Sequence, residues 1–279
     1  TPDYQKNGEI IIGLLENPQI KEIIPDSVKK IIFQLNDQGY YLKISENKII
    51  LTAKTEKGIF YSIQTLIQLL KNSQIHSSSI PCATIIDEPA FLWRGWQDDI
   101  SRGPIPHMDF LKKQIKILSH YKLNCVTLYT EHVFKSQKHP ILAPEQGLSP
   151  EEIQELIEFA KPYHIEVIGN FQSFGHFKHI LKHEEYSHLG ENDWVLSPAV
   201  DESYDFLSSI YSEIIPLYEN EYFHINCDET WGLGTGPAKG MLDSLGEGGL
   251  YAYHINKIDS IIRPYNKKIM MWGDIAVHH

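Results

Sequence analysis

The segment Tyr222–Gly236, YFHINCDETWGLGTG, places two adjacent carboxylates at the end of a predicted strand. An apolar run from Tyr222 to Ile225 indicates the strand, and a glycine-rich turn follows Asp228 and Glu229. On a buried parallel strand, two like charges this close raise one pKa, so one carboxyl can donate a proton near neutral pH while its neighbour stays ionised. A bare Asp-Glu pair is more often a solvated acidic turn, so the rest of the chain must decide between these two interpretations.

The composition of the 279-residue chain is that of a globular protein with a sizeable core, since 42% of its residues are hydrophobic. A net charge of −11 and the lack of a basic cluster argue against a nucleic-acid partner. No apolar run reaches the about 18 residues of a membrane span. Cys82, Cys125 and Cys227 are scattered without a CxxC pair, so neither a zinc site nor a disulfide framework is predicted. We expect no metal and no cofactor.

The start of the chain carries no signal-peptide pattern, although an initial Thr in place of Met suggests a processed or trimmed chain. We expect a periplasmic or secreted protein, with a cytoplasmic location as the alternative.

Residues 1–85 are predicted to form a small α/β domain, which a polar linker at Lys71–Pro89 joins to the rest. A hairpin is indicated by two strand patterns separated by Ser45-Glu46-Asn47. The predicted elements are a strand at Glu9–Leu15, a helix at Ser27–Leu35, hairpin strands at Tyr40–Ile44 and Lys48–Thr52, and a helix at Glu56–Leu70.

Residues 90–279 repeat one pattern, in which an apolar strand, a polar loop and a helix follow each other. Such alternation predicts parallel strands joined by crossovers, in either an open doubly wound sheet or a barrel. No GxGxxG follows the first strand, which weakens the dinucleotide-binding version of the open sheet. The strands are predicted at Trp93–Ile100, Cys125–Thr130, Ile165–Phe171, Tyr222–Cys227 and Ile269–Ile275, and the helices at Phe110–Tyr121, Pro150–Tyr163, Tyr204–Tyr218 and Tyr251–Tyr265.

Every predicted strand of this second domain ends in polar or aromatic residues, and in both architectures the chemistry lies at the carboxyl ends of the strands. Acids, an arginine, amides and tryptophan suit a neutral polyhydroxylated ligand, because hydroxyls need donors and acceptors and the C–H face of a sugar stacks on an aromatic ring. In strand order the residues are Asp98, Asp99 and Arg102, then Tyr129 and Glu131, then Asn170, Gln172 and His176, then Asp228 and Glu229, then Trp272 and Asp274.

Three segments of the chain resemble glycoside hydrolase family 20, the β-N-acetylhexosaminidases. RGWQDDISR, from Arg94 to Arg102, is similar to the first barrel strand of that family, and HINCDE, from His224 to Glu229, is similar to its His-x-Gly-Gly-Asp-Glu motif. The region Tyr4–Leu70 resembles its small N-terminal domain. The resemblance implies a (β/α)8 TIM-type barrel, of which about five strands are present in this chain, so the barrel is expected to be incomplete.

Two features distinguish this chain within the family. The second strand ends in LYTEHVF, and Gln-x-x-Gly-His occurs at Gln172–His176, both of which resemble the hexosaminidase D-like branch. In addition, Asn226 and Cys227 replace the paired glycines of the family motif.

The resemblance implies removal of terminal β-linked N-acetylhexosamine through an oxazolinium intermediate that the substrate's own acetamido group forms. It assigns Glu229 as the general acid and later base, and Asp228 as the acceptor of the acetamido N–H. The expected partner is an N-acetylhexosamine-containing glycan, and the oligomeric state stays open. The residues expected to contact the sugar are Arg94, Asp99, Glu131, His176 and Trp272.

Two alternatives are compatible with the sequence. A chain with only part of the barrel can be an inactive or glycan-binding fragment. A metal-dependent hydrolase using His176, His224 and Asp228 has weaker support, because neither HxH nor HExxH spacing occurs.

Overall fold

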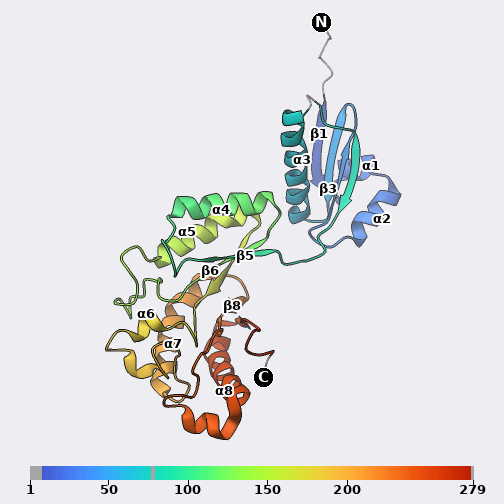
Figure 1. Cartoon of the computed structure of the whole chain (residues 1–279). Coiled ribbons are helices and arrows are strands. Elements are labelled where there is room, and N and C mark those ends of the chain that lie inside the picture. The colour runs from blue at the N-terminus through green and yellow to red at the C-terminus, as the bar shows by residue number, and fades with distance from the viewer. Residues whose placement is uncertain (1–7, 77–78, 278–279) are drawn as a thin grey trace. The chain divides into compact units, whose positions relative to one another are not determined.

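The computed structural model describes residues 8–76 and 79–277 and divides the chain into two compact units (Figure 1). One unit comprises the chain up to Arg94 together with Ile117–Leu123, and the other comprises Gly95–Lys116 and the chain from Asn124 onward. No helix of the described residues combines the length and the apolar character that a membrane span requires.

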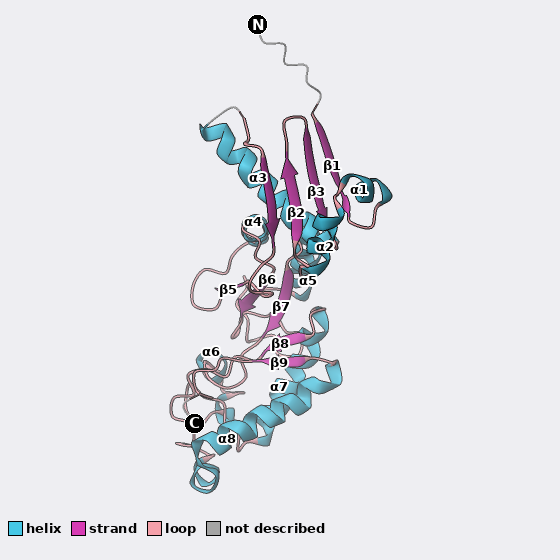
Figure 2. Ribbon diagram, turned by 90° about the vertical axis from the view of Figure 1, so that its right-hand side faces the viewer, coloured by secondary structure: helices cyan, strands magenta, loops and turns pink. Residues whose placement is uncertain are grey.

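The amino-terminal unit is a four-stranded sheet in the order β1-β3-β2-β4 with helices on both faces (Figure 2). Side chains alternate along a strand, so Tyr40 and Leu42 pack against Tyr61 of the long helix α3, while Tyr41 packs with Ile20 of α1 on the other face. The elements are β1 (Glu9–Leu14), α1 (Pro18–Ile23), α2 (Asp26–Gln34), β2 (Tyr40–Ile44), β3 (Lys48–Ala53), α3 (Glu56–His76) and β4 (Ala83–Asp87).

The predicted linker at Lys71–Pro89 is wrong, because most of it is regular structure. Helix α3 continues to His76, and Ala83–Asp87 forms strand β4, antiparallel to β2. The segment is short and is flanked by prolines, so its sequence resembles a loop. Its pairing partner lies more than forty residues earlier, where Tyr40 is opposite Asp87.

The larger unit contains five strands that are all parallel and pair in sequence order, β5-β6-β7-β8-β9. A doubly wound sheet reverses its strand order at a switch point, whereas a barrel pairs each strand with the next one along the chain. The strand order therefore indicates a barrel-type sheet rather than a doubly wound one. The strands are β5 (Gly95–Asp99), β6 (Cys125–Tyr129), β7 (Glu166–Asn170), β8 (Tyr222–His224) and β9 (Lys268–Met270).

The helices of this unit follow the predicted pattern, with a longer last helix. The predicted start of α5 is confirmed, since the hydroxyl of Ser149 and the carboxylate of Glu152 form a capping box. Helix α8 begins at Lys239, twelve residues before the predicted start, and bends at Gly246, where φ is 70°. The α-helices are α4 (Met108–His120), α5 (Pro150–Ala160), α6 (Lys178–Leu181), α7 (Asp201–Ile214) and α8 (Lys239–Ile262), and the 3-10 helices are η1 (Lys161–Tyr163), η2 (Ser187–Leu189), η3 (Ile215–Leu217) and η4 (Arg263–Tyr265).

Strands β8 and β9 are shorter than predicted. The apolar run of β8 continues beyond His224, but Asn226 and Cys227 take left-handed backbone angles and leave the strand. Strand β9 ends at Met270 rather than near Ile275. Because all five strands run in the same direction, their carboxyl ends lie along one edge of the sheet, and the loops that carry the predicted polar residues begin there.

Candidate active site

The turn after β8 carries both acids, and its backbone is unusual. Asn226, Cys227 and Glu229 have φ values of 61°, 65° and 47°, in the left-handed region that costs an L-residue about 1–2 kcal/mol. Two hydrogen bonds oppose this cost at Cys227: its N–H donates to Gln172 Oε1 at 3.1 Å, and its carbonyl accepts from the Tyr251 hydroxyl at 2.8 Å. The surrounding fold therefore holds the turn in this conformation.

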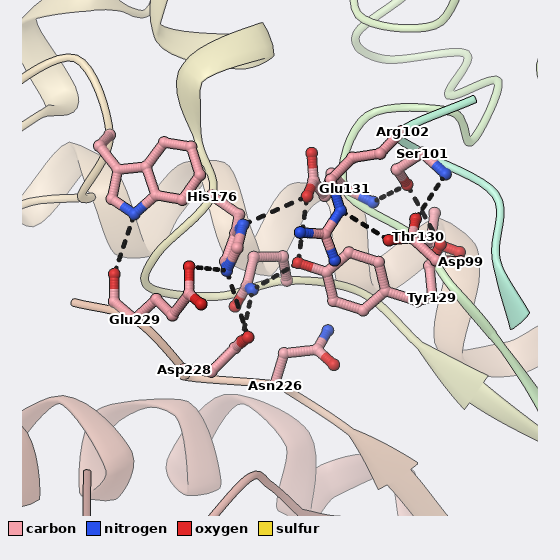
Figure 3. Close-up of polar contacts among 12 residues, drawn as sticks. Asp99, Ser101, Arg102, Tyr129, Thr130, Glu131, His176, Asn226, Asp228 and Glu229 are labelled. Atoms are coloured by element: carbon pink, nitrogen blue, oxygen red, sulfur yellow. Dashed lines mark hydrogen bonds and ion pairs between the residues drawn. The ribbon is translucent and has the colours of Figure 1, made fainter. Parts of the chain in front are cut away.

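Asp228 is the more buried of the two acids, with 20% of its side chain exposed. Its Oδ1 accepts from Gln172 Nε2 at 3.0 Å, and its Oδ2 lies 3.2 Å from Nε2 of His176 (Figure 3). Burial alone would raise the pKa of Asp228, but the hydrogen bonds from His176 and Gln172 and the charge of His176 hold that pKa below its usual value. Asp228 is therefore ionised at neutral pH.

His176 lies between the acids and a third carboxylate. Its side chain is 1% exposed, with Nδ1 3.4 Å from Glu131 Oε1 and Nε2 3.2 and 3.5 Å from the carboxylates of Asp228 and Glu229. At 3.4 Å the contact with Glu131 is an ion pair rather than a well-formed hydrogen bond. Burial lowers the pKa of His176, but Asp228 and Glu131 raise it further, to about 9. The imidazolium thus holds the carboxylates together.

Glu131 is buried at the carboxyl end of β6, with 4% of its side chain exposed. Its Oε1 accepts a hydrogen bond from the hydroxyl of Tyr129 at 3.1 Å, and its backbone N–H donates to the hydroxyl of Ser101 at 2.9 Å. Figure 3 shows its carboxylate directed toward His176. The structure therefore brings Glu131 and His176 together with the two acids, although contact of either residue with a sugar stays a prediction.

Glu229 is the exposed member of the group, with 48% of its side chain exposed. Its backbone carbonyl accepts from the indole N–H of Trp194 at 2.9 Å and from the N–H of Trp231 at 2.8 Å. The Trp194 ring lies 4.5 Å from the ring of His176. These contacts fix the backbone of Glu229 while its carboxyl group stays open to solvent, as a group that exchanges protons with a bound molecule requires.

Gln172 contacts Asp228 directly, and the sequence analysis placed it at a strand end without including it among the expected sugar-binding residues. Its side chain is completely buried, and its Nε2 donates both to the hydroxyl of Tyr129 at 3.1 Å and to Asp228 at 3.0 Å. Its Oε1 accepts from the N–H groups of Cys227 and Ser173. The sequence signal for its role was an amide directly after a predicted core strand. If such a side chain is buried, it must satisfy its hydrogen bonds within the fold.

Asp99 lies at the carboxyl end of β5, where the sequence predicts it, but its carboxylate is already paired. Its Oδ2 accepts from Nε of Arg102 at 2.6 Å, and its Oδ1 accepts from the N–H of Ser101 at 3.0 Å. The guanidinium of Arg102 in turn lies 5.4 Å from the centre of the Tyr129 ring. This geometry orders the loop after β5, and direct sugar binding by Asp99 stays a prediction.

Arg94 belongs to the amino-terminal unit, whereas the two acids belong to the larger unit. Arg94 precedes the amino end of β5, and within the amino-terminal unit its guanidinium donates to Gln38 Oε1 at 2.8 Å and to the carbonyls of Lys122 and Phe91 at 2.8 and 2.7 Å. These contacts hold the guanidinium in a structural role. Donation by Arg94 to sugar hydroxyls stays a prediction.

Trp272 follows β9 and lies at the same edge of the sheet as the acids. Its backbone N–H donates to the carbonyl of Asn226 at 3.0 Å. Its ring packs edge-on against the ring of His224, with the ring centres 5.2 Å apart. Because 39% of Trp272 is exposed, part of the residue remains accessible to a ligand. Its role as a wall of the sugar pocket stays a prediction.

The described residues contain one group of three side chains that could hold a metal ion: Glu131, His132 and His179. The alternative set of His176, His224 and Asp228 is not such a group among those residues. His224 instead accepts a hydrogen bond from the N–H of Asn226 at 3.2 Å, and burial lowers its pKa. The structure thus gives no support to the metal-dependent hydrolase built on His224.

Gly175 is required for the close approach of the His176 loop to the acids. A Cβ at this position would lie 2.3 Å from the carbonyl oxygen of Asp228, and backbone cannot yield as a flexible side chain does. We expect Gly175→Ala to lower the free energy of unfolding by about 1–3 kcal/mol, measured by urea denaturation. Gly240→Ala in helix α8 is the matched control, since its Cβ meets open space and Ala favours the helix. Equal stability of the two variants would contradict the close contact.

Comparison with known proteins adds family assignments for both regions of the chain. The family model described as the catalytic domain of glycosyl hydrolase family 20 matches residues 91–279, and the model for domain 2 of that family matches residues 3–88. A beta-hexosaminidase of Porphyromonas gingivalis is 26% identical over an alignment of 287 positions, which covers 86% of this chain and 36% of that protein.

Solved structures agree with the fold. The chitobiase of Flavobacterium johnsoniae has a TM-score of 0.79 at 21% identity, covering 97% of this chain and 50% of that one. An exo-β-N-acetylglucosaminidase of Vibrio harveyi, solved with N-acetylglucosamine, has a TM-score of 0.73 at 25% identity, covering 95% of this chain and 46% of that one. The chain therefore spans half or less of the length of these proteins.

Proposed function

Because the chain belongs to glycosyl hydrolase family 20, we propose that it removes terminal β-linked N-acetylhexosamine, GlcNAc or GalNAc, from glycans by substrate-assisted catalysis with retention. The observation that carries the proposal is the pair of adjacent acids at the carboxyl end of β8. Asp228 and Glu229 lie 3.2 and 3.5 Å from the same nitrogen of His176, one ionised and mostly buried, the other open to solvent.

In the first step the acetamido oxygen of the substrate attacks the anomeric carbon as the glycosidic C–O bond breaks. Glu229 in its acid form gives its proton to the departing oxygen, and the sugar becomes a bicyclic oxazolinium. Asp228 accepts the acetamido N–H, which orients the amide and stabilises the positive charge that develops on it. The ionised state of Asp228 supports this role, because a neutral carboxyl would not offset the charge.

In the second step water attacks the anomeric carbon from the face that the leaving group vacated, and Glu229, now a carboxylate, takes the proton of that water. The oxazolinium opens, the acetamido group is restored and the configuration is retained. Two inversions at one carbon need no protein nucleophile, so one proton-transferring acid and one orienting carboxylate suffice. His176 and Gln172 act on Asp228 as positioning residues, through the hydrogen bonds that hold its carboxylate.

The test is the initial rate on an aryl N-acetyl-β-glucosaminide beside the matching aryl β-glucoside, which lacks the acetamido group. The assay is run on this chain and on any longer chain that contains it. Cleavage of the first substrate alone supports the proposal, and equal cleavage of both overturns its substrate-assisted part.

A second candidate is a glycan-binding unit without turnover, which the partial coverage of the relatives favours. The same substrates distinguish it. Saturable binding of N-acetylglucosamine without cleavage of either glycoside, in this chain and in longer forms alike, would replace hydrolysis with binding as the function.

The raised pKa of His176 predicts a pH dependence of stability. Its folded-state pKa of about 9 exceeds the ordinary value of 6.5, so the stabilisation is complete below about pH 6.5 and is lost as the pH rises through about 9. We expect the free energy of unfolding to fall in this window by on the order of 3 kcal/mol. Urea denaturation at a series of pH values, in buffer containing a chelator, measures it.

The control for this prediction is His176→Gln, which replaces the imidazole N–H with an amide N–H donor but cannot titrate. Its stability is expected to be lower at pH 6 and nearly flat between about pH 6.5 and 9. A decline as steep as that of the wild type would assign the effect to other groups.

A further inference from the structure

A second cluster of side chains lies next to the acids, and its two histidines have no part in the proposed hydrolysis. His132 follows Glu131 in the loop after β6, and His179 belongs to helix α6. One ligand atom from each of Glu131, His132 and His179 lies within 4.8 Å of the other two. The two imidazole rings are stacked, with their centres 4.2 Å apart and their planes at 15°.

The cluster leaves a buried nitrogen without a partner. Nδ1 of His132 is inaccessible to solvent and has no hydrogen bond. A buried polar atom without a partner costs about 1–3 kcal/mol. A nearby group that accepts the nitrogen lone pair would remove this cost.

We propose that Glu131, His132 and His179 form a binding site for a divalent transition-metal ion of the Zn²⁺ class. Two imidazoles and one carboxylate are the ligand set of three-ligand zinc sites, in which a fourth position stays open for water. Tetrahedral ligands at zinc-nitrogen distances of about 2.0–2.1 Å lie about 3.4 Å from one another. The two ring planes are nearly parallel in the present arrangement, so both imidazoles must turn for their lone pairs to meet at one ion. The mix of nitrogen and oxygen ligands disfavours Ca²⁺ and Mg²⁺, which prefer oxygen alone.

The shared carboxylate links this site to the acids. Glu131 is also the residue 3.4 Å from Nδ1 of His176, and His176 holds Asp228. A metal ion that coordinates the Glu131 carboxylate weakens the contact between Glu131 and His176 and lowers the hydrolysis rate. This consequence rests on the proposed function, whereas metal binding itself does not.

The first experiment measures binding without reference to activity. The chain is freed of metal with a chelator, dialysed and titrated with Co²⁺, whose visible absorption reports tetrahedral coordination. We expect one saturable site per chain, with affinity at least about tenfold weaker in His132→Gln and in His179→Gln. His188→Gln, which removes an exposed histidine of η2, is the matched control and keeps the wild-type affinity. Saturable binding that survives in both site variants, or no saturable absorption in the wild type, overturns the proposal.

A second measurement guards against variants that fold poorly. Zn²⁺ that binds the folded state raises the unfolding temperature, so the wild type and His188→Gln should be stabilised and the two site variants should not. His179 is partly exposed on a four-residue helix, so its replacement is expected to leave the fold intact. The same shift in all four proteins contradicts the site. If the metal-free protein shows no hydrolysis but the Co²⁺ and Zn²⁺ results hold, the metal site stands and the proposed function falls.

Discussion

Replacing Glu229 with Gln is expected to lower kcat/KM about 10²–10⁴-fold on substrates with poor leaving groups, because the variant cannot give a proton to the departing oxygen. In aryl glycosides of acidic phenols, the phenolate can leave without protonation. The rate of the first step on these substrates should therefore fall far less. The fold should be unchanged, since nearly half of the Glu229 side chain is exposed and its fixed backbone contacts do not involve the carboxyl group. The measurement compares both substrate types, with circular dichroism as the check on folding.

The control for this prediction is Glu145→Gln, which removes one exposed carboxylate from a loop far along the chain from the acids. It should retain full activity on both substrates. A Glu229→Gln variant that loses equal rate on activated and unactivated leaving groups would count against its role as the acid.

Asp228→Asn is expected to lower kcat about 10²–10³-fold with little change in fold, because the variant keeps the shape of the side chain but loses the charge that faces the acetamido group. The amide oxygen of Asn can still accept from Gln172. The loss should appear on N-acetylglucosaminides of every leaving group, which separates this role from proton transfer by Glu229.

A second readout follows from the contact between Asp228 and His176. Asp228 is one of the two carboxylates that raise the pKa of His176 to about 9, so that pKa should fall in Asp228→Asn and NMR titration of the imidazole should show it. Asp205→Asn, an exposed residue of α7, is the control and should change neither the rate nor the titration. Wild-type kcat in Asp228→Asn would remove Asp228 from the mechanism.

The sequence predicted those elements whose pattern is local. The hairpin β2-β3 lies within one residue of its predicted position because two short apolar runs flank a polar turn. The adjacent acids were likewise visible in the sequence, as two carboxylates that follow an apolar run ending at Ile225. By contrast, the choice between a barrel and a doubly wound sheet depends on which strands pair, and no strand pattern contains that information.

The contacts between the site residues could not be predicted for the same reason. Nothing in the sequence shows that Glu131 lies 3.4 Å from His176, because the two residues are on different loops. The left-handed angles at Asn226 and Cys227 were also unexpected, since such angles favour glycine. They explain why the paired glycines of the family motif occupy these two positions: the turn after β8 has the same shape requirement in this chain and meets it with other residues.

The amide of Gln172 accepts a hydrogen bond from a backbone N–H 55 residues later in the chain, at Cys227, and donates to the next residue. The turn after β8 is therefore not stable by itself during folding. It can close only after β7 and β8 have paired and brought this amide into place, and such distant contacts are slow to form. In a refolding experiment, helical circular dichroism should recover first, and the capacity to bind an N-acetylated sugar should return in a later phase.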